Sequence, residues 1–167
     1  MPHNAAIPEF LAKYTPEIAA QLQVAREHLA QHFPRGFELV YDNYNALVFA
    51  FSSSERASDA ILSVAGYPRW VTLFFAHGTT LPDPTHILEG GGTQFRSVKL
   101  QPPSRLTEHA VQELINAAKA AAGAELEAAP PLATLVKSVS AKQRARKPAT
   151  KMQVAGAKSV RSRSSGA

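Results

Sequence analysis

The polar residues best suited to binding chemistry surround the only tryptophan of this sequence. Trp70 opens the run WVTLFF, and tyrosine and arginine residues lie on either side of that run. Aromatic rings can form the walls of a pocket, and an arginine can hold a carboxylate or a phosphate through two parallel hydrogen bonds. The sequence therefore predicts a ligand site, with no catalytic residue, at one end of a sheet. The predicted ligand-binding residues are Glu38, Tyr41, Asn43, Tyr67, Arg69, Trp70 and Arg96. Turn chemistry combined with ordinary surface arginines explains the same pattern, and the sequence leaves both interpretations open.

The sequence contains no complete motif for catalysis or for metal binding. His28 and His32 stand four residues apart, which is the spacing of two metal ligands on a helix, but no third ligand can be identified. The serines and histidines form no nucleophile elbow, and the chain has no cysteine. The triple glycine at residues 90–92 lacks the lysine–serine ending of a phosphate-binding loop, so a flexible turn is favoured. We expect no cofactor and no metal site among these residues. The sequence favours a non-enzymatic protein and leaves open whether the chain catalyses a reaction.

Hydrophobic periodicity predicts the elements that would position the site. Apolar stripes at helical spacing indicate two helices, over residues 15–33 and 107–123. Thr15 and Thr107 are the expected N-caps, and Asp83 is expected to cap one or two further helical turns. Runs rich in aromatic and β-branched residues indicate strands at residues 37–41, 46–51, 60–64, 70–75 and 94–100.

The predicted fold class is α+β. It has an antiparallel sheet of about five strands, with the N- and C-terminal helices packed on one face. The opposite face would keep apolar side chains, which indicates a partner subunit or a ligand groove, unless the registers differ and these residues are ordinary core. The side chains in question include Val48, Ala50, Trp70 and Phe74.

Charge divides the chain into two parts. Residues 1–130 contain nine Lys/Arg and thirteen Asp/Glu, whereas residues 131–167 contain nine Lys/Arg and no acidic residue. The second part also lacks aromatic residues, so it should not bury enough apolar surface to offset the entropy of ordering. We expect a lead-in over residues 1–14, an α+β domain over 15–125 and a basic, disordered tail over 126–167. Candidate nucleic-acid contacts in the tail are Lys142, Arg144, Arg146, Lys147 and Lys151.

The sequence has no sign of a membrane segment. No apolar run approaches the ~20 residues that a spanning helix needs. The first ten residues, MPHNAAIPEF, lack the basic region and apolar core of a signal peptide. A cytoplasmic location is expected.

Several sequence blocks carry a family resemblance. YPRWVTLFF, the LPDP turn, LEGGGTQFRSVKL and the upstream FELVYDNYNALVFAF are similar to the domain of unknown function 1801 family, in its YdhG-like group. The resemblance covers residues 15–123 and implies a compact α+β domain similar in outline to frataxin-type folds. One branch of the family has been proposed to handle iron. In this chain the acidic residues are spread over several elements, which does not favour a cluster of carboxylate ligands.

Three functions follow from these observations. The first is a non-enzymatic binding module, as a monomer or a homodimer, that holds a protein or a small anionic or aromatic ligand in the aromatic–arginine pocket. The second is a nucleic-acid-associated protein that binds through its basic tail. The third, implied by the resemblance, is a frataxin-like iron-binding chaperone. Residues 1–125 alone should keep the first activity and lose the second.

Overall fold

The computed structural model describes residues 4–148, which form an α+β domain. Four α-helices lie in this range: α1 (Ala6–Leu11), α2 (Pro16–His32), α3 (His109–Ala121) and α4 (Gly123–Ala128). The six strands described are β1 (Phe37–Asp42), β2 (Leu47–Ser52), β3 (Ala60–Gly66), β4 (Val71–Phe75), β5 (Arg96–Lys99) and β6 (Ala133–Val139). Three short 3-10 helices join them: η1 (Ala57–Asp59), η2 (Gly78–Thr80) and η3 (Pro103–Thr107).

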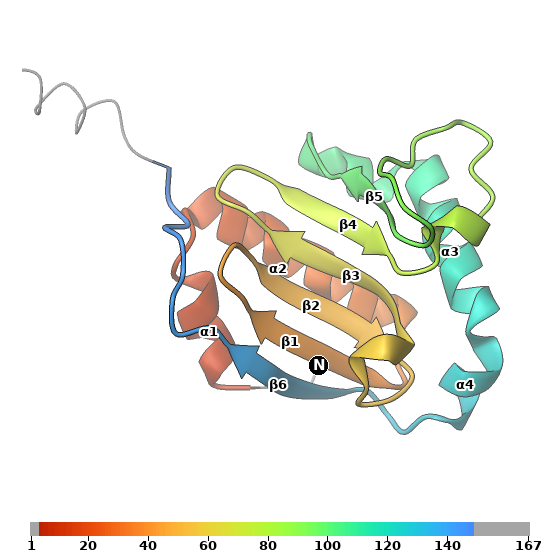
Figure 1. Ribbon diagram of the computed structural model, residues 1–167, viewed down its shortest axis with the longest axis horizontal. Helices are drawn as coiled ribbons and strands as arrows, with labels where there is room; N and C mark the ends of the chain where they lie inside the picture. The colour runs from red at the N-terminus through yellow and green to blue at the C-terminus, as the bar shows by residue number, and fades with distance from the viewer. Residues whose placement is uncertain (1–3, 149–167) are drawn as a thin grey trace, which may run out of the picture.

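The described strands form one mixed sheet, in the order β5-β4-β3-β2-β1-β6 (Figure 1). The successive strands β1, β2, β3, β4 and β5 pair antiparallel with one another, as predicted. β6 pairs parallel with β1, so the sheet is neither five-stranded nor wholly antiparallel. A parallel neighbour needs a long crossover connection, and here almost the whole domain separates β1 from β6.

The register of the antiparallel ladders sorts the strand residues into rows that alternate between two faces. One face packs against α2 and α3, and its rows are Val40–Phe49–Val64–Leu73–Val98 and Glu38–Phe51–Leu62–Phe75–Arg96. The rows on the other face, which we call the open face, are Leu39–Ala50–Ser63–Phe74–Ser97 and Tyr41–Val48–Ala65–Thr72–Lys99.

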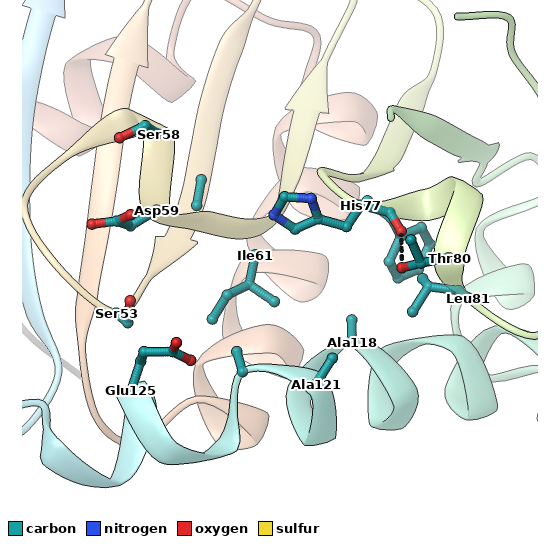
Figure 2. Close-up of a pocket in the computed structure, with 13 residues that line it drawn as sticks. Ser53, Ser58, Asp59, Ile61, His77, Thr80, Leu81, Ala118, Ala121 and Glu125 are labelled. Carbon is teal, nitrogen blue, oxygen red and sulfur yellow. Dashed lines mark hydrogen bonds between the residues drawn. The ribbon is translucent and has the colours of Figure 1, made fainter. Parts of the chain in front are cut away.

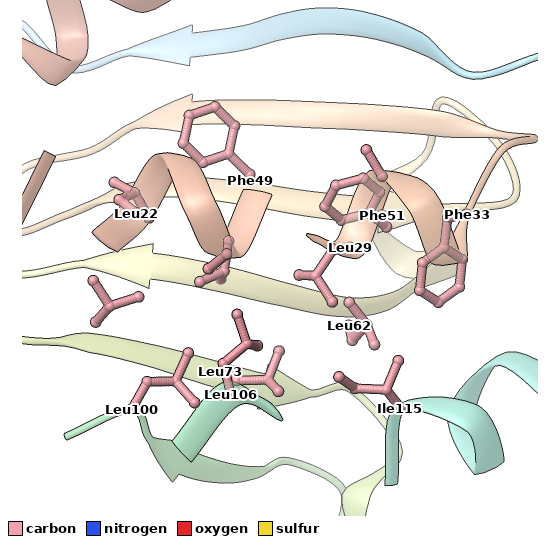
Figure 3. Close-up of a cluster of buried hydrophobic side chains, with 14 of the residues drawn as sticks. Leu22, Leu29, Phe33, Phe49, Phe51, Leu62, Leu73, Leu100, Leu106 and Ile115 are labelled. Atoms are coloured by element: carbon pink, nitrogen blue, oxygen red, sulfur yellow. The ribbon is translucent and has the colours of Figure 1, made fainter. Parts of the chain in front are cut away.

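The hydrophobic core lies between the sheet and the helices (Figure 3). Leu22 and Leu29 of α2 pack over Phe49 and Phe51 of β2, and Ile115 of α3 closes the core near β3. All five side chains are fully buried. The predicted apolar stripes of the two long helices are therefore the core-facing residues.

The open face carries no α-helix in residues 4–148. Figure 1 shows α2 behind the sheet and the other face turned toward the viewer. Leu39 and Ala65 on this face are buried, whereas Tyr41, Val48 and Phe74 are half-buried. Apolar side chains thus remain on the uncovered side of the sheet, as the sequence indicates.

The N-caps follow the prediction only in part. The Thr15 side chain accepts a hydrogen bond from the Ile18 amide at 3.4 Å, at the start of α2. Asp83 caps no helix, since its carboxylate accepts from the amides of Ile87 and Leu88 in a turn. The N-cap of α3 is Glu108 rather than Thr107, because η3 continues through Thr107.

The segment predicted to be disordered is ordered at least as far as residue 148. It contains the end of α4 and the whole of β6, so the expected domain boundary at residue 125 is wrong in this part of the chain. The turn that leads into β6 pairs with Gly36, whose φ of +107° favours glycine. Gly36 donates to Pro130 O at 2.7 Å and accepts from the Ala133 amide at 3.1 Å. Residues 149–167 lie outside the described part.

Candidate functional site

The structure brings together three of the seven predicted ligand-binding residues. Tyr67, Arg69 and Trp70 belong to the β3–β4 connection and line a surface hollow of about 510 Å³, which we call the Trp70 hollow. The other lining residues are Asn45, Pro68, Arg144 and Ala145. The hollow therefore lies where the β1–β2 turn, the β3–β4 turn and the segment after β6 meet.

Two aromatic rings and a lysine hold the geometry of the hollow. The ring centroids of Tyr67 and Trp70 are 5.9 Å apart at an interplanar angle of 34°, and the Tyr67 amide donates to Trp70 O at 2.9 Å. Lys99, next to Thr72 in the sheet register, places its Nζ 3.8 Å from the centroid of the Trp70 ring. This cation–π contact fixes the indole while both rings stay half-exposed.

The charge of the hollow is positive. Arg69 and Arg144 line it and are exposed, Lys99 adjoins it, and none of its described lining residues is acidic. Burial raises the pKa of the Tyr67 hydroxyl, so this group is a neutral hydrogen-bond donor near neutral pH. Aromatic faces next to guanidinium groups suit a planar anion. Trp70 is half-buried, and its ring is accessible from the hollow.

Glu38 is not part of this site. It lies on the helix-covered face, fully buried, where both carboxylate oxygens bond to Arg26 of α2 at 2.8 and 2.7 Å. Thr134 of β6 donates to Glu38 Oε1 at 2.7 Å. A buried carboxylate paired in this way fixes α2 and β6 to the sheet and cannot contact a ligand in the hollow.

The remaining predicted residues are also elsewhere. Tyr41 lies on the open face, and its hydroxyl is buried without a hydrogen-bond partner among residues 4–148. Asn43 belongs to the β1–β2 turn, where its main-chain N–H donates to Ala46 O at 2.9 Å. Arg96 is the first residue of β5, at the end of that strand away from the Trp70 hollow, and it donates to Phe95 O at 2.7 Å and to Gly92 O at 3.2 Å. It pairs in register with Phe75, whereas Trp70 lies beyond the opposite end of β4.

The predicted tail cations have different environments. Arg144 lines the Trp70 hollow, and its amide donates to Tyr44 O at 2.9 Å. Arg146 is 3% exposed and forms an ion pair with Asp42, which is fully buried. Lys142 and Lys147 are exposed, and Lys151 lies outside the described residues. Arg146 is therefore a structural residue and not a free nucleic-acid contact.

Asp42 is the anchor for this C-terminal segment. Its carboxylate accepts from Arg146 Nη1 and from Lys13 Nζ, each at 2.5 Å. Burial raises the pKa of Asp42, but the hydrogen bonds from Lys13, Gln143 and Arg146 and the charge of Arg146 together outweigh it, so its pKa lies below the ordinary value. Sequence reasoning missed this contact because Asp42 and Arg146 are 104 residues apart.

A second cavity, of about 290 Å³, lies at the opposite end of the strands (Figure 2). It is bounded by the beginning of β3, the end of β4 and α3. Its floor is apolar and includes Ile61, Phe75 and Ala118. Polar side chains around it come from the η1 loop, the residues after β4, and α4: Ser53, Ser58, Asp59, His77, Thr80 and Glu125. Sequence reasoning did not single out these residues, since they are scattered over 73 positions with no motif spacing.

The histidine pair on α2 is bound within the protein. The Nε2 atoms of His28 and His32 lie 3.1 and 3.3 Å from Gln112 Oε1 on α3. Burial, and then the neighbouring His28, lower the pKa of His32. Within residues 4–148 no group of three or more His, Cys, Asp or Glu side chains could hold a metal ion. The iron-handling alternative therefore has no such ligand set in this part of the chain.

Comparison with protein-family models, with curated proteins and with solved structures finds no match to this chain. The resemblance to the YdhG-like group accordingly stays a prediction that rests on the sequence blocks. No helix among the described residues has the length and apolar character needed to cross a membrane.

Proposed function

We propose that this protein is a non-enzymatic binding module whose ligand is a planar, aromatic anion held in the Trp70 hollow. One observation carries the proposal: two half-exposed aromatic rings lie in a hollow with two arginines and an adjacent lysine, and none of its described lining residues is acidic. The rings offer a stacking surface, and the guanidinium groups offer paired hydrogen bonds to a carboxylate or phosphate.

The charge and the ring of the ligand can be tested separately by calorimetry on the full chain. Phenyl phosphate carries both features, inorganic phosphate carries only the charge, and benzylamine carries the ring with the opposite charge. We expect saturable binding of phenyl phosphate that is at least tenfold tighter than that of either comparison compound. Equal binding of phenyl phosphate and benzylamine would remove the electrostatic part of the proposal.

A nucleic-acid partner is the second candidate, because the segment after β6 places Arg144 on the same hollow. Lys142 and Lys147 of this segment are exposed as well. Aromatic side chains next to cations are the usual platform for single-stranded nucleic acid, and such binding weakens steeply with salt. Fluorescence anisotropy with a single-stranded oligonucleotide at two salt concentrations tests this candidate. A Lys142→Ala/Arg144→Ala/Lys147→Ala variant with unchanged affinity would exclude these contacts.

The open face gives the proposed module room for a protein partner, and a homodimer through that face is part of the proposal. Half-buried apolar side chains such as Val48 and Phe74 lie there without a covering helix in residues 4–148. Sedimentation of the full chain over a range of concentrations tests the homodimer. A monomer throughout that range would rule it out.

A further inference from the structure

We infer that the cavity between η1, α3 and α4 is a second binding site, for a small organic amine with a compact apolar body. This cavity is separate from the Trp70 hollow, with which it shares no lining residue. Ligand binding in this cavity therefore does not depend on ligand binding in the Trp70 hollow.

The cavity exists because small side chains line one of its walls. Ala118 and Ala121 of α3 face it, together with Ala122 between α3 and α4, and no larger side chain of α3 fills the space. Ile61 and Phe75 at the strand ends, together with Leu81, complete an apolar floor. A cavity of about 290 Å³ is close to the lower limit of ~300 Å³ for small-molecule sites. It suits a compact ligand.

The His77 ring and the Glu125 carboxylate are among the polar groups on the cavity that form no hydrogen bond within residues 4–148. Figure 2 shows the His77 ring reaching over Ile61 and the Glu125 carboxylate directed toward the same space from α4. The bond drawn there for His77 comes from its main-chain oxygen, which accepts from Thr80 Oγ1 at 2.8 Å and leaves the ring free. Neither the His77 ring nor the Glu125 carboxylate forms a hydrogen bond inside the described part of the chain.

The charged residues that line the cavity, Asp59 and Glu125, are both acidic and therefore favour a cationic ligand. Asp59 is already engaged, since its Oδ2 accepts from Ser54 Oγ at 2.6 Å and lies 3.4 Å from Arg56 Nε. The Glu125 carboxylate is the charged group without an ion pair here, and the described lining residues include no lysine or arginine. A carboxylate next to an apolar floor favours a ligand with a cationic head and an apolar body. The His77 ring offers a hydrogen bond to a second polar group of the same ligand.

The test uses 2-phenylethylamine and its anionic counterpart 3-phenylpropionate as probes of the full chain, by calorimetry and thermal unfolding. We expect saturable binding of the amine with a rise in the unfolding temperature, and no saturable effect of the carboxylate. Glu125→Gln should weaken amine binding at least tenfold. Glu127→Gln is the matched control, because Glu127 is an exposed residue of the same helix that does not line the cavity.

Ala121→Leu tests the cavity itself, since Ala121 is exposed and a leucine there would occupy the space without disturbing the core. This variant should fold and lose amine binding. Three results would each overturn the inference: no saturable binding of the amine to the native chain, equal affinity of the Glu125→Gln and native proteins, or unchanged binding by Ala121→Leu.

Discussion

At the scale of single residues, Arg146 fixes the segment after β6 to the sheet through its ion pair with Asp42. Its position in a basic, acid-free segment predicts a solvent-exposed nucleic-acid contact, yet the side chain is buried against Asp42. The composition of the segment could not show this, because the partner carboxylate comes from the first strand of the sheet. A cation that neutralises a buried acid stabilises the fold and is unavailable to a polyanion.

Replacing Arg146 should therefore destabilise the protein. Arg146→Ala leaves the buried Asp42 with Lys13 as its remaining cationic partner, so we expect a loss near the lower end of the ~3–5 kcal/mol measured for broken buried pairs. Urea unfolding measures this loss. Lys147→Ala is the control, since Lys147 is exposed and its removal should change stability by less than ~0.5 kcal/mol. Equal stabilities of the two variants would show that the ion pair contributes nothing.

Asp42 also predicts a pH dependence. A carboxyl whose folded-state pKa lies below its ordinary value of 3.8 contributes stability above that value. The contribution is lost as the pH falls through the folded-state pKa. The free energy of unfolding of the native protein should thus decrease below about pH 4, and the decrease should be shallower in Asp42→Asn. Parallel slopes for the two proteins would mean that other carboxyl groups dominate acid unfolding.

Because Trp70 is only half-buried, its removal should cost less stability than the removal of a core ring. Phe49→Ala removes a fully buried ring and should cost ~3–5 kcal/mol, the usual range for large-to-small core substitutions. Trp70→Ala removes a half-exposed ring and should cost about half as much. Thermal or urea unfolding of both variants makes the comparison. If Trp70→Ala costs as much as Phe49→Ala, the indole is a core residue and the hollow is not preformed.

At the scale of elements, local patterns predict the strands and helices whose hydrophobic faces are strong. The aromatic and β-branched runs predict the positions of β1 to β4 to within two residues, and the apolar stripes predict α2 and α3. The structure brings predicted site residues together where they are sequence neighbours, as Tyr67, Arg69 and Trp70 are. Residues from separate strands, such as Glu38 and Arg96, lie away from the hollow because their face depends on register, which the sequence leaves open.

β6 is the strand that sequence patterns did not predict. Its residues, ATLVKSV, include β-branched side chains but follow a proline pair and precede a run of cations. What stabilises this strand is non-local: main-chain pairing with β1, the Thr134–Glu38 hydrogen bond and the Arg146–Asp42 ion pair. Composition measures the average polarity of a segment and cannot detect partners about 100 residues away.

Truncation tests the contribution of this element. A chain ending at Pro130 lacks β6 and Arg146, so its free energy of unfolding should fall by more than the ~3 kcal/mol expected for Arg146→Ala. A chain ending at Pro148 keeps every contact described above and is the matched comparison. Identical melting temperatures for the two truncated chains would show that β6 is dispensable and would restore the disordered-tail interpretation.

At the scale of the whole molecule, the two candidate sites lie at the edges of the sheet and not over its centre. One layer of helices builds the core, and the open face is left without a second layer in residues 4–148. The cationic Trp70 hollow and the cavity with the free Glu125 carboxylate lie at opposite ends of the strands. The buried ion pairs of Glu38 and Asp42 therefore lie on the helix-covered face, whereas both candidate sites are open at the surface.

The measurement that tests the central claim most directly is a titration of tryptophan fluorescence with phenyl phosphate. Trp70 is the only tryptophan in the sequence, so its emission reports on the hollow and on no other site. We predict a saturable change in emission, with an affinity at least tenfold weaker in Arg69→Ala/Arg144→Ala and unchanged in Lys142→Ala, whose residue is exposed and outside the hollow. An emission that does not change, or a double arginine variant that binds as tightly as the native chain, would contradict a ligand site in the Trp70 hollow.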